Sequence, residues 1–171
     1  LGLRDARDRR ILNTVKVIDG LLGVHTPHGI AYRRYNGDGY GEHDNGASFD
    51  GTGIGRLWPL LTGERAHLDL MLGIDPLPYL EMMTRMTGAS GLLPEQVWDT
   101  DPIPQRGLEP GKPTGSAMPL VWAHAEYVKL CRSLQDGDVF DRPPQTVERY
   151  LLNKTTSSRI TWRFNNKVRA I

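Results

Sequence analysis

The sequence is poor in the features that mark several large classes of protein. It has a single cysteine, Cys131, which excludes an internal disulfide framework. Its 21 Lys and Arg residues nearly balance its 20 Asp and Glu residues, and the net charge of +1 excludes the strongly basic surface of most nucleic-acid-binding proteins. No apolar run approaches the ~18 residues that a membrane span needs. The sequence therefore predicts neither a nucleic acid nor a membrane as a partner.

Charge is concentrated only near the end of the chain, where cations occur without acids between Lys154 and Arg169. We interpret this stretch as the solvated face of a strand. The triplet Asn153-Lys154-Thr155 fits a glycosylation acceptor, but such triplets occur often by chance. The chain starts without methionine on "LGLRDARDRR" and stops on "NNKVRAI", which favours a segment of a longer protein.

What the sequence does contain is helical periodicity, interrupted by long stretches rich in glycine and proline. The spacing of apolar residues predicts helices over about 8–22, 57–72, 77–86 and 117–135, with a short helix in "PPQTVERYLL". Alternation at Ile160, Trp162 and Phe164 predicts one late strand. The segment of about 24–55 shows no sustained period, and its length is typical of functional loops. The predicted class is mainly α.

Several motifs that suggest cofactors or metals have weak support. "GTGIGR" at 51–56 lacks the spacing and the preceding strand of a dinucleotide fingerprint. His25 and His28 have no further ligand pair at a suitable spacing. "DGYGEHDNGASFDG" lacks the ligand order of an EF-hand. His124 and Glu126 are expected to have structural roles, as is the thiol of Cys131 in the predicted helix "YVKLCRSL". We therefore predict no metal and no cofactor.

A carbohydrate site is better supported by composition. Flat aromatic faces and polar partners occur in or beside the long loops, the mixture that a sugar ring requires. The aromatic candidates are Trp58, Trp98, Trp122, Tyr32, Tyr35 and Tyr40. The polar candidates are Arg33, Arg34, Glu95 and Gln96. Glu95 is notable because it lies in "GLLPEQVWD", where a proline and apolar residues surround a single glutamate.

Four strings resemble one known family in the same order along the chain: "RYNGDGYGE", "FDGTGIGRLWPLLTGER", "GLLPEQVWD" and "PTGSAMPLVWAHAEYVKL". They are similar to the catalytic domain of the bacterial glucoamylase and glucodextranase group, glycoside hydrolase family 15. The resemblance implies the C-terminal part of an (α/α)6 barrel whose active site lies among loops at one end. It also implies an enzyme that removes glucose from the non-reducing ends of α-glucans with inversion.

The resemblance implies roles for particular residues. Glu95 matches the general base, which activates a water opposite the leaving oxygen. Arg34 matches the arginine that holds the innermost glucose, and a planar guanidinium suits two neighbouring hydroxyls. Trp58 is expected to line the same pocket, and Trp98 and Tyr35 are further candidates for substrate contact. The expected partner is an α-glucan or oligosaccharide.

The general acid of the family lies in an earlier tryptophan-glutamate string, which this chain does not contain; Glu42 and Glu64 belong to other motifs. We therefore expect residues 1–152 to form the C-terminal half of the barrel, completed by its N-terminal part, and 153–171 to follow as a strand segment. Alone, the chain is expected to be inactive. The alternatives are a glucosidase for another α-glucoside, such as α-1,6 dextran or trehalose, and a non-catalytic sugar-binding module. The resemblance favours a secreted or cell-envelope location.

Overall fold

The computed structural model describes residues 2–152, 161–164 and 167–170, with side chains for 2–152. It divides into two compact units, Ala6–Phe140 and a smaller one formed by Leu1–Asp5 and Asp141–Ile171. No helix in the described part of the chain is long and apolar enough to cross a membrane. The larger unit carries every predicted site residue and is described first.

The larger unit begins with a helix and a hairpin. Helix α1 (Arg9–Leu21) starts at Asp8, whose carboxylate accepts a hydrogen bond from the backbone N–H of Arg10 at 2.9 Å. Strands β1 (Gly23–Thr26) and β2 (Gly29–Tyr32) follow and pair antiparallel. The sequence predicted no strand here, and this was wrong: four-residue strands are too short to show a clear period.

Three further helices form the body of this unit: α2 (Pro59–Leu72), α3 (Leu77–Arg85) and α4 (Val121–Asp136). Proline occupies the first turn of α2 and α3, where its missing N–H has no helical partner. Helices α2 and α4 end at Gly73 and Gly137, both in the left-handed conformation that glycine adopts without strain. Only the start of α4, predicted at 117, differs by several residues.

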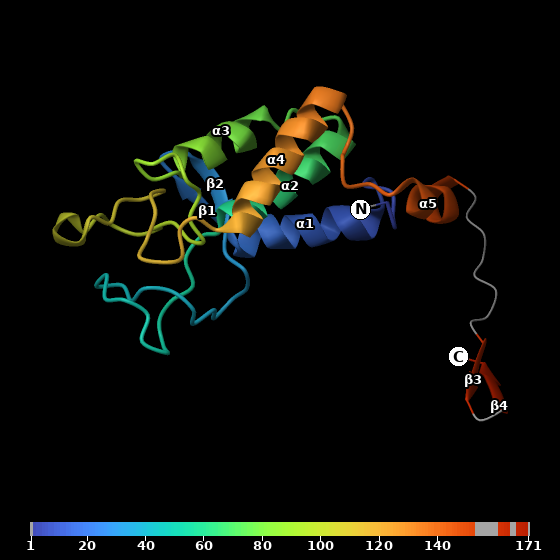
Figure 1. Ribbon diagram of the computed structural model, residues 1–171, viewed down its shortest axis with the longest axis horizontal. Coiled ribbons are helices and arrows are strands. Elements are labelled where there is room, and N and C mark those ends of the chain that lie inside the picture. The colour runs from blue at the N-terminus through green and yellow to red at the C-terminus, as the bar shows by residue number, and fades with distance from the viewer. Residues whose placement is uncertain (1, 153–160, 165–166, 171) are drawn as a thin grey trace. The chain divides into compact units, whose positions relative to one another are not determined.

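Helices α2 and α4 pack side by side in the same direction (Figure 1). Near their starts, a Cβ on Gly63 would lie 2.6 Å from Cγ of Glu126, and further along, the His67 imidazole lies 3.1 Å from the Ser133 hydroxyl. Helix α3 packs against both and, after a short connection from α2, runs back toward the start of α2. Alternate helices that are parallel, with a returning helix between them, are the arrangement of a partial (α/α)6 barrel.

Apolar side chains from these helices form two clusters. The first fills the space between α2, α3 and α4, and its buried members are Trp58, Leu60, Ala66, Met83, Leu93, Ala123 and Leu130. The second joins the hairpin to α3 and to the loops, and its buried members are Ala31, Leu57, Met82, Met86 and Val97. Leu93 and Val97 flank the sequence position of Glu95, so both clusters anchor the segment that carries this carboxylate.

The smaller unit contains α5 (Pro144–Val147), a π-helical turn η2 (Glu148–Leu152), and the antiparallel strands β3 (Thr161–Phe164) and β4 (Lys167–Ala170). The short helix and the late strand were both expected from the sequence, whereas β4 was not. The acceptor triplet at Asn153, the predicted boundary at 152/153 and part of the basic stretch lie outside the described residues.

Candidate active site

Two long segments, 33–58 and 86–120, precede α2 and α4 and meet beside the starts of these helices (Figure 1). A bridge joins them where Leu57 and Val97 exchange backbone hydrogen bonds, with N···O distances of 3.3 and 2.9 Å. Val97 also bridges to Pro113 on its other side. The stretch around Glu95 is therefore a central strand-like element between two other segments.

A buried arginine fixes the two segments to each other. The guanidinium of Arg56 is fully buried; Nε and Nη2 donate to the carbonyl oxygen of Glu42 at 3.0 and 2.5 Å, and Nη1 donates to Asp99 at 2.9 Å. Arg33 donates to the other oxygen of Asp99. The backbone N–H of Arg56 donates to the side-chain oxygen of Gln96 at 2.8 Å. Arg33 and Gln96, expected as sugar partners, thus serve to hold the loops.

The glycines of the first segment allow two stretches of backbone to touch. A Cβ built on Gly53 would lie 1.9 Å from the carbonyl oxygen of Gly41, and one on Gly41 would lie 2.2 Å from the carbonyl oxygen of Ile54. Only glycine fits at these positions. The string "GTGIGR" is thereby explained by close packing of the loop on itself.

Glu95 is held at its backbone and partly exposed at its side chain. Its N–H donates to the carbonyl oxygen of Ala117 at 2.8 Å, and the next N–H, of Gln96, donates to the Ser116 hydroxyl at 2.9 Å. The preceding Pro94 is buried. Leu93, Val97 and Trp98 of "GLLPEQVWD" are buried in the core, while the carboxylate faces a cavity. That cavity is lined by Tyr40, Gly41, Glu42, Ser48, Phe49, Glu95, Gln96, Gly115, Ser116 and Ala117.

Arg34 is anchored by a two-point ion pair. Its Nε and Nη2 donate to the two carboxylate oxygens of Asp38 at 2.7 and 2.8 Å, and these hydrogen bonds raise the pKa of Arg34. Burial alone raises the pKa of Asp38, but the hydrogen bonds from Arg34 and from the N–H of Tyr40 outweigh it, so the pKa is lowered. Both groups therefore stay charged through mildly acidic pH. The remaining nitrogen, Nη1, lies outside this pair.

Aromatic rings surround the guanidinium of Arg34. Its Cζ lies 4.7 Å from the ring centroid of Trp58, 5.0 Å from that of Tyr40 and 5.4 Å from that of Tyr35. Each distance is within the range of a cation–π interaction. The hydroxyl of Tyr40 donates to Oε2 of Glu95 at 3.1 Å, so the two predicted site residues are linked through this ring. Arg34, Trp58, Tyr35 and Glu95 thus lie in one neighbourhood.

The candidate aromatic residues differ in what they present. Tyr35 is 55% exposed and offers a free face. Trp98 is fully buried beneath Arg56, whose Cζ lies 4.2 Å from its centroid, and its Nε1 donates to the carbonyl oxygen of Asp101 at 2.7 Å. This geometry favours a supporting role for Trp98 over contact with a sugar. Tyr32 is also buried, with its hydroxyl donating to Asp19.

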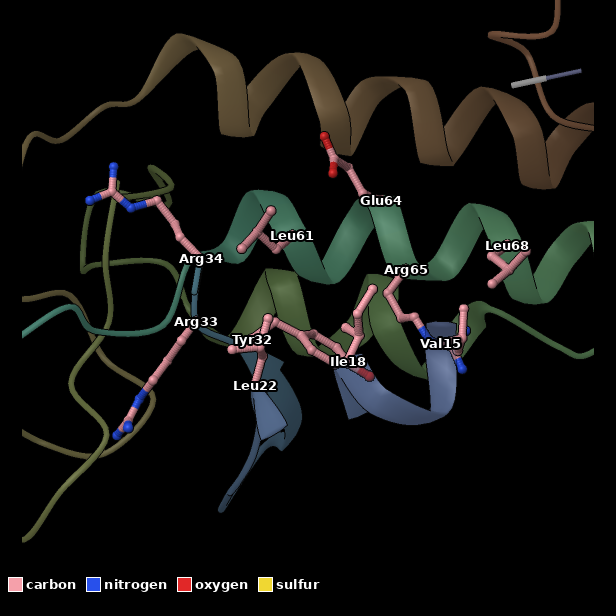
Figure 2. A pocket seen from close by; sticks show the side chains of 10 residues that line it. All are labelled: Val15, Ile18, Leu22, Tyr32, Arg33, Arg34, Leu61, Glu64, Arg65 and Leu68. Atoms are coloured by element: carbon pink, nitrogen blue, oxygen red, sulfur yellow. The ribbon is translucent and has the colours of Figure 1, made fainter. Parts of the chain in front are cut away.

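A second cavity lies between α1 and α2 (Figure 2). Half of its ten lining residues are aliphatic: Val15 and Ile18 from α1, Leu22 directly after α1, and Leu61 and Leu68 from α2. The arginines that follow β2 lie at one end of it (Figure 2). The polar residues that also line it are largely engaged with carboxylates, as Arg65 is with Asp19 and Asp69, so we interpret this cavity as a packing surface and not as the best candidate for a sugar site.

Two residues assigned structural roles from the sequence have partners in the core. His124 accepts a hydrogen bond from the N–H of Leu93 at 2.9 Å. Glu126 is buried beside His67, with 2.9 Å between Nδ1 and Oε1, and beside Lys129 at 2.8 Å. Among the described residues, no group of three or more His, Cys, Asp and Glu side chains could hold a metal ion.

Sequence reasoning did not assign Asp38, Arg56 and Asp99 to the site. Asp38 had a detectable signal, because an aspartate four residues after Arg34 in a glycine-rich turn is within reach of its guanidinium. Arg56 and Asp99 had none, since their pairing joins segments 43 residues apart in the sequence. Tyr40 was counted as a possible sugar platform, but its hydrogen bond to Glu95 spans 55 residues and could not be foreseen.

The fold and the site together define a part of an (α/α)6 barrel that presents a carboxylate and an arginine on adjoining loops. No family model matches the chain. A glucoamylase of Clostridium sp. (strain G0005) is 44% identical over 151 residues, which are 88% of this chain and 20% of that protein. A crystal structure of a bacterial glucoamylase complexed with acarbose matches with a TM-score of 0.80 and 44% identity, over 88% of this chain and 21% of that one.

The chain is therefore a glucoamylase homologue, and the resemblance seen in the four sequence strings is confirmed. It spans about a fifth of the length of the curated relative that it matches. The expectation of a mainly helical piece of a larger barrel is confirmed as well.

Proposed function

We propose that this chain is a segment of an exo-acting α-glucan glucohydrolase that releases glucose from non-reducing ends with inversion. The observation that carries the proposal is Glu95, a carboxylate with a fixed backbone that faces a cavity in a glucoamylase homologue. The acarbose bound by the related bacterial glucoamylase supports an oligosaccharide as the ligand class.

In this mechanism Glu95 is the general base. Its carboxylate takes a proton from a water while the water oxygen bonds to the anomeric carbon. The bond from that carbon to the leaving oxygen breaks on the opposite face, and the general acid, expected outside this chain, gives the leaving oxygen its proton. Because Pro94 and Leu93 are buried and the N–H of Glu95 is bonded to Ala117, the base has little freedom to move.

Arg34, Tyr35 and Trp58 are assigned to the glucose at the cleavage point. Asp38 occupies Nε and Nη2 of Arg34, which directs Nη1 as the donor for sugar hydroxyls. The buried Nε1 of Trp58 has no partner among the described residues, which fits a donor to a ligand. The exposed ring of Tyr35 suits the apolar face of a sugar.

The test is removal of the Glu95 carboxylate in the intact enzyme. Glu95→Gln keeps shape and loses the base, so we expect glucose release to fall by ~10²–10⁴-fold. Glu109→Gln is the matched control, because Glu109 is an exposed carboxylate of the same long segment. Maltooligosaccharide, isomaltooligosaccharide and trehalose, assayed in parallel, identify the preferred linkage.

A second variant separates a general base from a binding carboxylate. In Glu95→Ala, space opens where the base and its water act, and azide should replace water as the nucleophile and give a glucosyl azide of β configuration. Recovery of turnover by azide together with this product supports the assignment. Full activity of Glu95→Gln, or an α-configured azide, removes Glu95 from the role of base in an inverting reaction.

A further inference from the structure

Tyr40, on the first long segment, makes a direct side-chain contact with Glu95, on the second long segment. Its hydroxyl lies 3.1 Å from Oε2 of Glu95, and its ring lies 5.0 Å from Cζ of Arg34. The edge of the ring meets Phe49, with centroids 5.0 Å apart and planes at 71°, and its face is tilted against Trp58 at 6.4 Å. A ring with neighbours on several sides has few alternative rotamers, so its hydroxyl is held in place.

The backbone that carries Tyr40 is fixed as well. Its N–H donates to Oδ1 of Asp38 at 3.0 Å, and the following Gly41 is pressed against the carbonyl oxygen of Ile54. Asp38 in turn accepts the backbone N–H of Tyr40 and the guanidinium of Arg34 on the same carboxylate oxygen. The position of the phenol therefore follows from the same contacts that place Arg34.

The electrostatic surroundings keep this phenol a donor. Burial raises the pKa of Tyr40, and the charge of Glu95 with the hydrogen bond to it raises the pKa further. The charged groups that face it are Glu95, Arg34 and Glu42, with Asp38 behind Arg34. Tyr40 therefore remains protonated throughout the pH range in which a glycosidase base is ionised and active.

A phenol donates one hydrogen bond, so it satisfies one oxygen of the carboxylate. Oε2 of Glu95 takes this bond, and the free oxygen, Oε1, is left to accept a proton from water. We propose that Tyr40 is a positioning residue: its hydroxyl holds Oε2 of Glu95 and thereby directs Oε1 toward the attacking water. This inference rests on the proposed function of Glu95 as the general base.

The experiment compares Tyr40→Phe with the parent in the intact enzyme. Phenylalanine keeps the ring packing and removes only the hydroxyl. We expect kcat to fall about tenfold, the effect of one hydrogen bond to a charged group, while KM stays within about twofold. Because the ionised base loses a donor, the acidic limb of the kcat/KM profile should move to higher pH.

The control is Tyr127→Phe, which removes a phenolic hydroxyl whose partner is Thr84, on the neighbouring helix α3. It should leave kcat and the pH profile unchanged, so a general effect of losing a tyrosine hydroxyl is separated from the effect at Glu95. Circular dichroism and the melting temperature establish that both variants are folded.

Each outcome decides one of the two claims. If Glu95→Gln is inactive but Tyr40→Phe has the parental kcat and acidic limb, the positioning role is wrong and the proposed base stands. If KM rises while kcat and the acidic limb hold, the hydroxyl binds substrate, and the inference is overturned. If Glu95→Gln keeps its activity, the proposed function itself fails, whatever Tyr40→Phe does.

Discussion

Replacement of Arg34 by lysine isolates the value of a guanidinium at this position. The substitution keeps the positive charge, but it removes the planar group that donates to both oxygens of Asp38. A lysine ammonium also lacks the flat face that lies 4.7 Å from the Trp58 centroid. With one flexible head, the side chain cannot hold Asp38 at two points and bind a sugar hydroxyl as well. Both substrate binding and turnover should suffer.

The magnitude follows from the hydrogen bonds that a lysine cannot make. A hydrogen bond to a charged group contributes about 1.5–3 kcal/mol. The side chain of Arg34 is 31% exposed, so water screens the site in part and the lower half of this range applies. A loss of about 1.5–2 kcal/mol corresponds to roughly a ten- to thirtyfold fall in kcat/KM. The fall should be shared between KM and kcat, because the innermost glucose is bound in both the ground state and the transition state.

The assay is steady-state glucose release from maltooligosaccharides by the intact enzyme. Arg106→Lys is the matched control, since Arg106 is an exposed arginine of the second long segment. It should behave as the parent does. If Arg34→Lys keeps KM and kcat within about twofold of the parent, the arginine does not contact the substrate. The innermost glucose would then have to bind away from Arg34 and Trp58.

Two further predictions concern the loops and the surface. Arg56→Met removes one of the two arginines that pair with the Asp99 carboxylate, which is 0% exposed. Because Arg33 still pairs with Asp99, the cost should lie at the low end of the ~3–5 kcal/mol of a broken buried pair. Thermal unfolding should show a clear fall in melting temperature. An unchanged melting temperature would mean that Arg56 does not hold the two long segments together. Purified alone, the 171-residue chain should self-associate and bind an apolar dye, because Val121 and Val128 on α4 are 78% and 65% exposed. A monodisperse monomer in light scattering, without dye binding, would mean that these helices close a complete core.

Much of the helical framework could be read from the sequence, because its signals are local. In α2 the proline at the first turn and the glycine after Leu72 mark both ends, and apolar spacing fills the interval. The hairpin was missed since its strands have four residues each and alternate weakly in burial. The start of α4 was placed too early because residues 117–120 are largely apolar but pair with earlier residues of the same long segment, as Leu120 does with Leu93.

For the candidate site, the sequence was enough to propose single residues but not the contacts between them. Glu95 and Arg34 were proposed from the strings that contain them, and the structure places both beside Tyr40. Trp98 lies in the same string as Glu95, and its full burial depends on Arg56, which comes from the other segment. Nothing in either string alone indicates that contact. The structural neighbours of a catalytic group are set by tertiary pairing, which one sequence does not display.

The glycine-rich loop that precedes α2 illustrates why composition misleads about rigidity. Such a segment suggests flexibility, yet here glycine permits backbone contacts that any side chain would block, such as Gly53 against Gly41. The Arg56 guanidinium donates to the carbonyl oxygen of Glu42, and the carboxylate of Glu42 accepts a hydrogen bond from the N–H of Gly115 at 2.7 Å. These bonds connect the backbone next to Tyr40 with the segment that carries Glu95. The proposed role of Glu95 as a base requires this kind of fixed support, because one oxygen has to stay directed at a water, and the close backbone contacts that the glycines permit supply it.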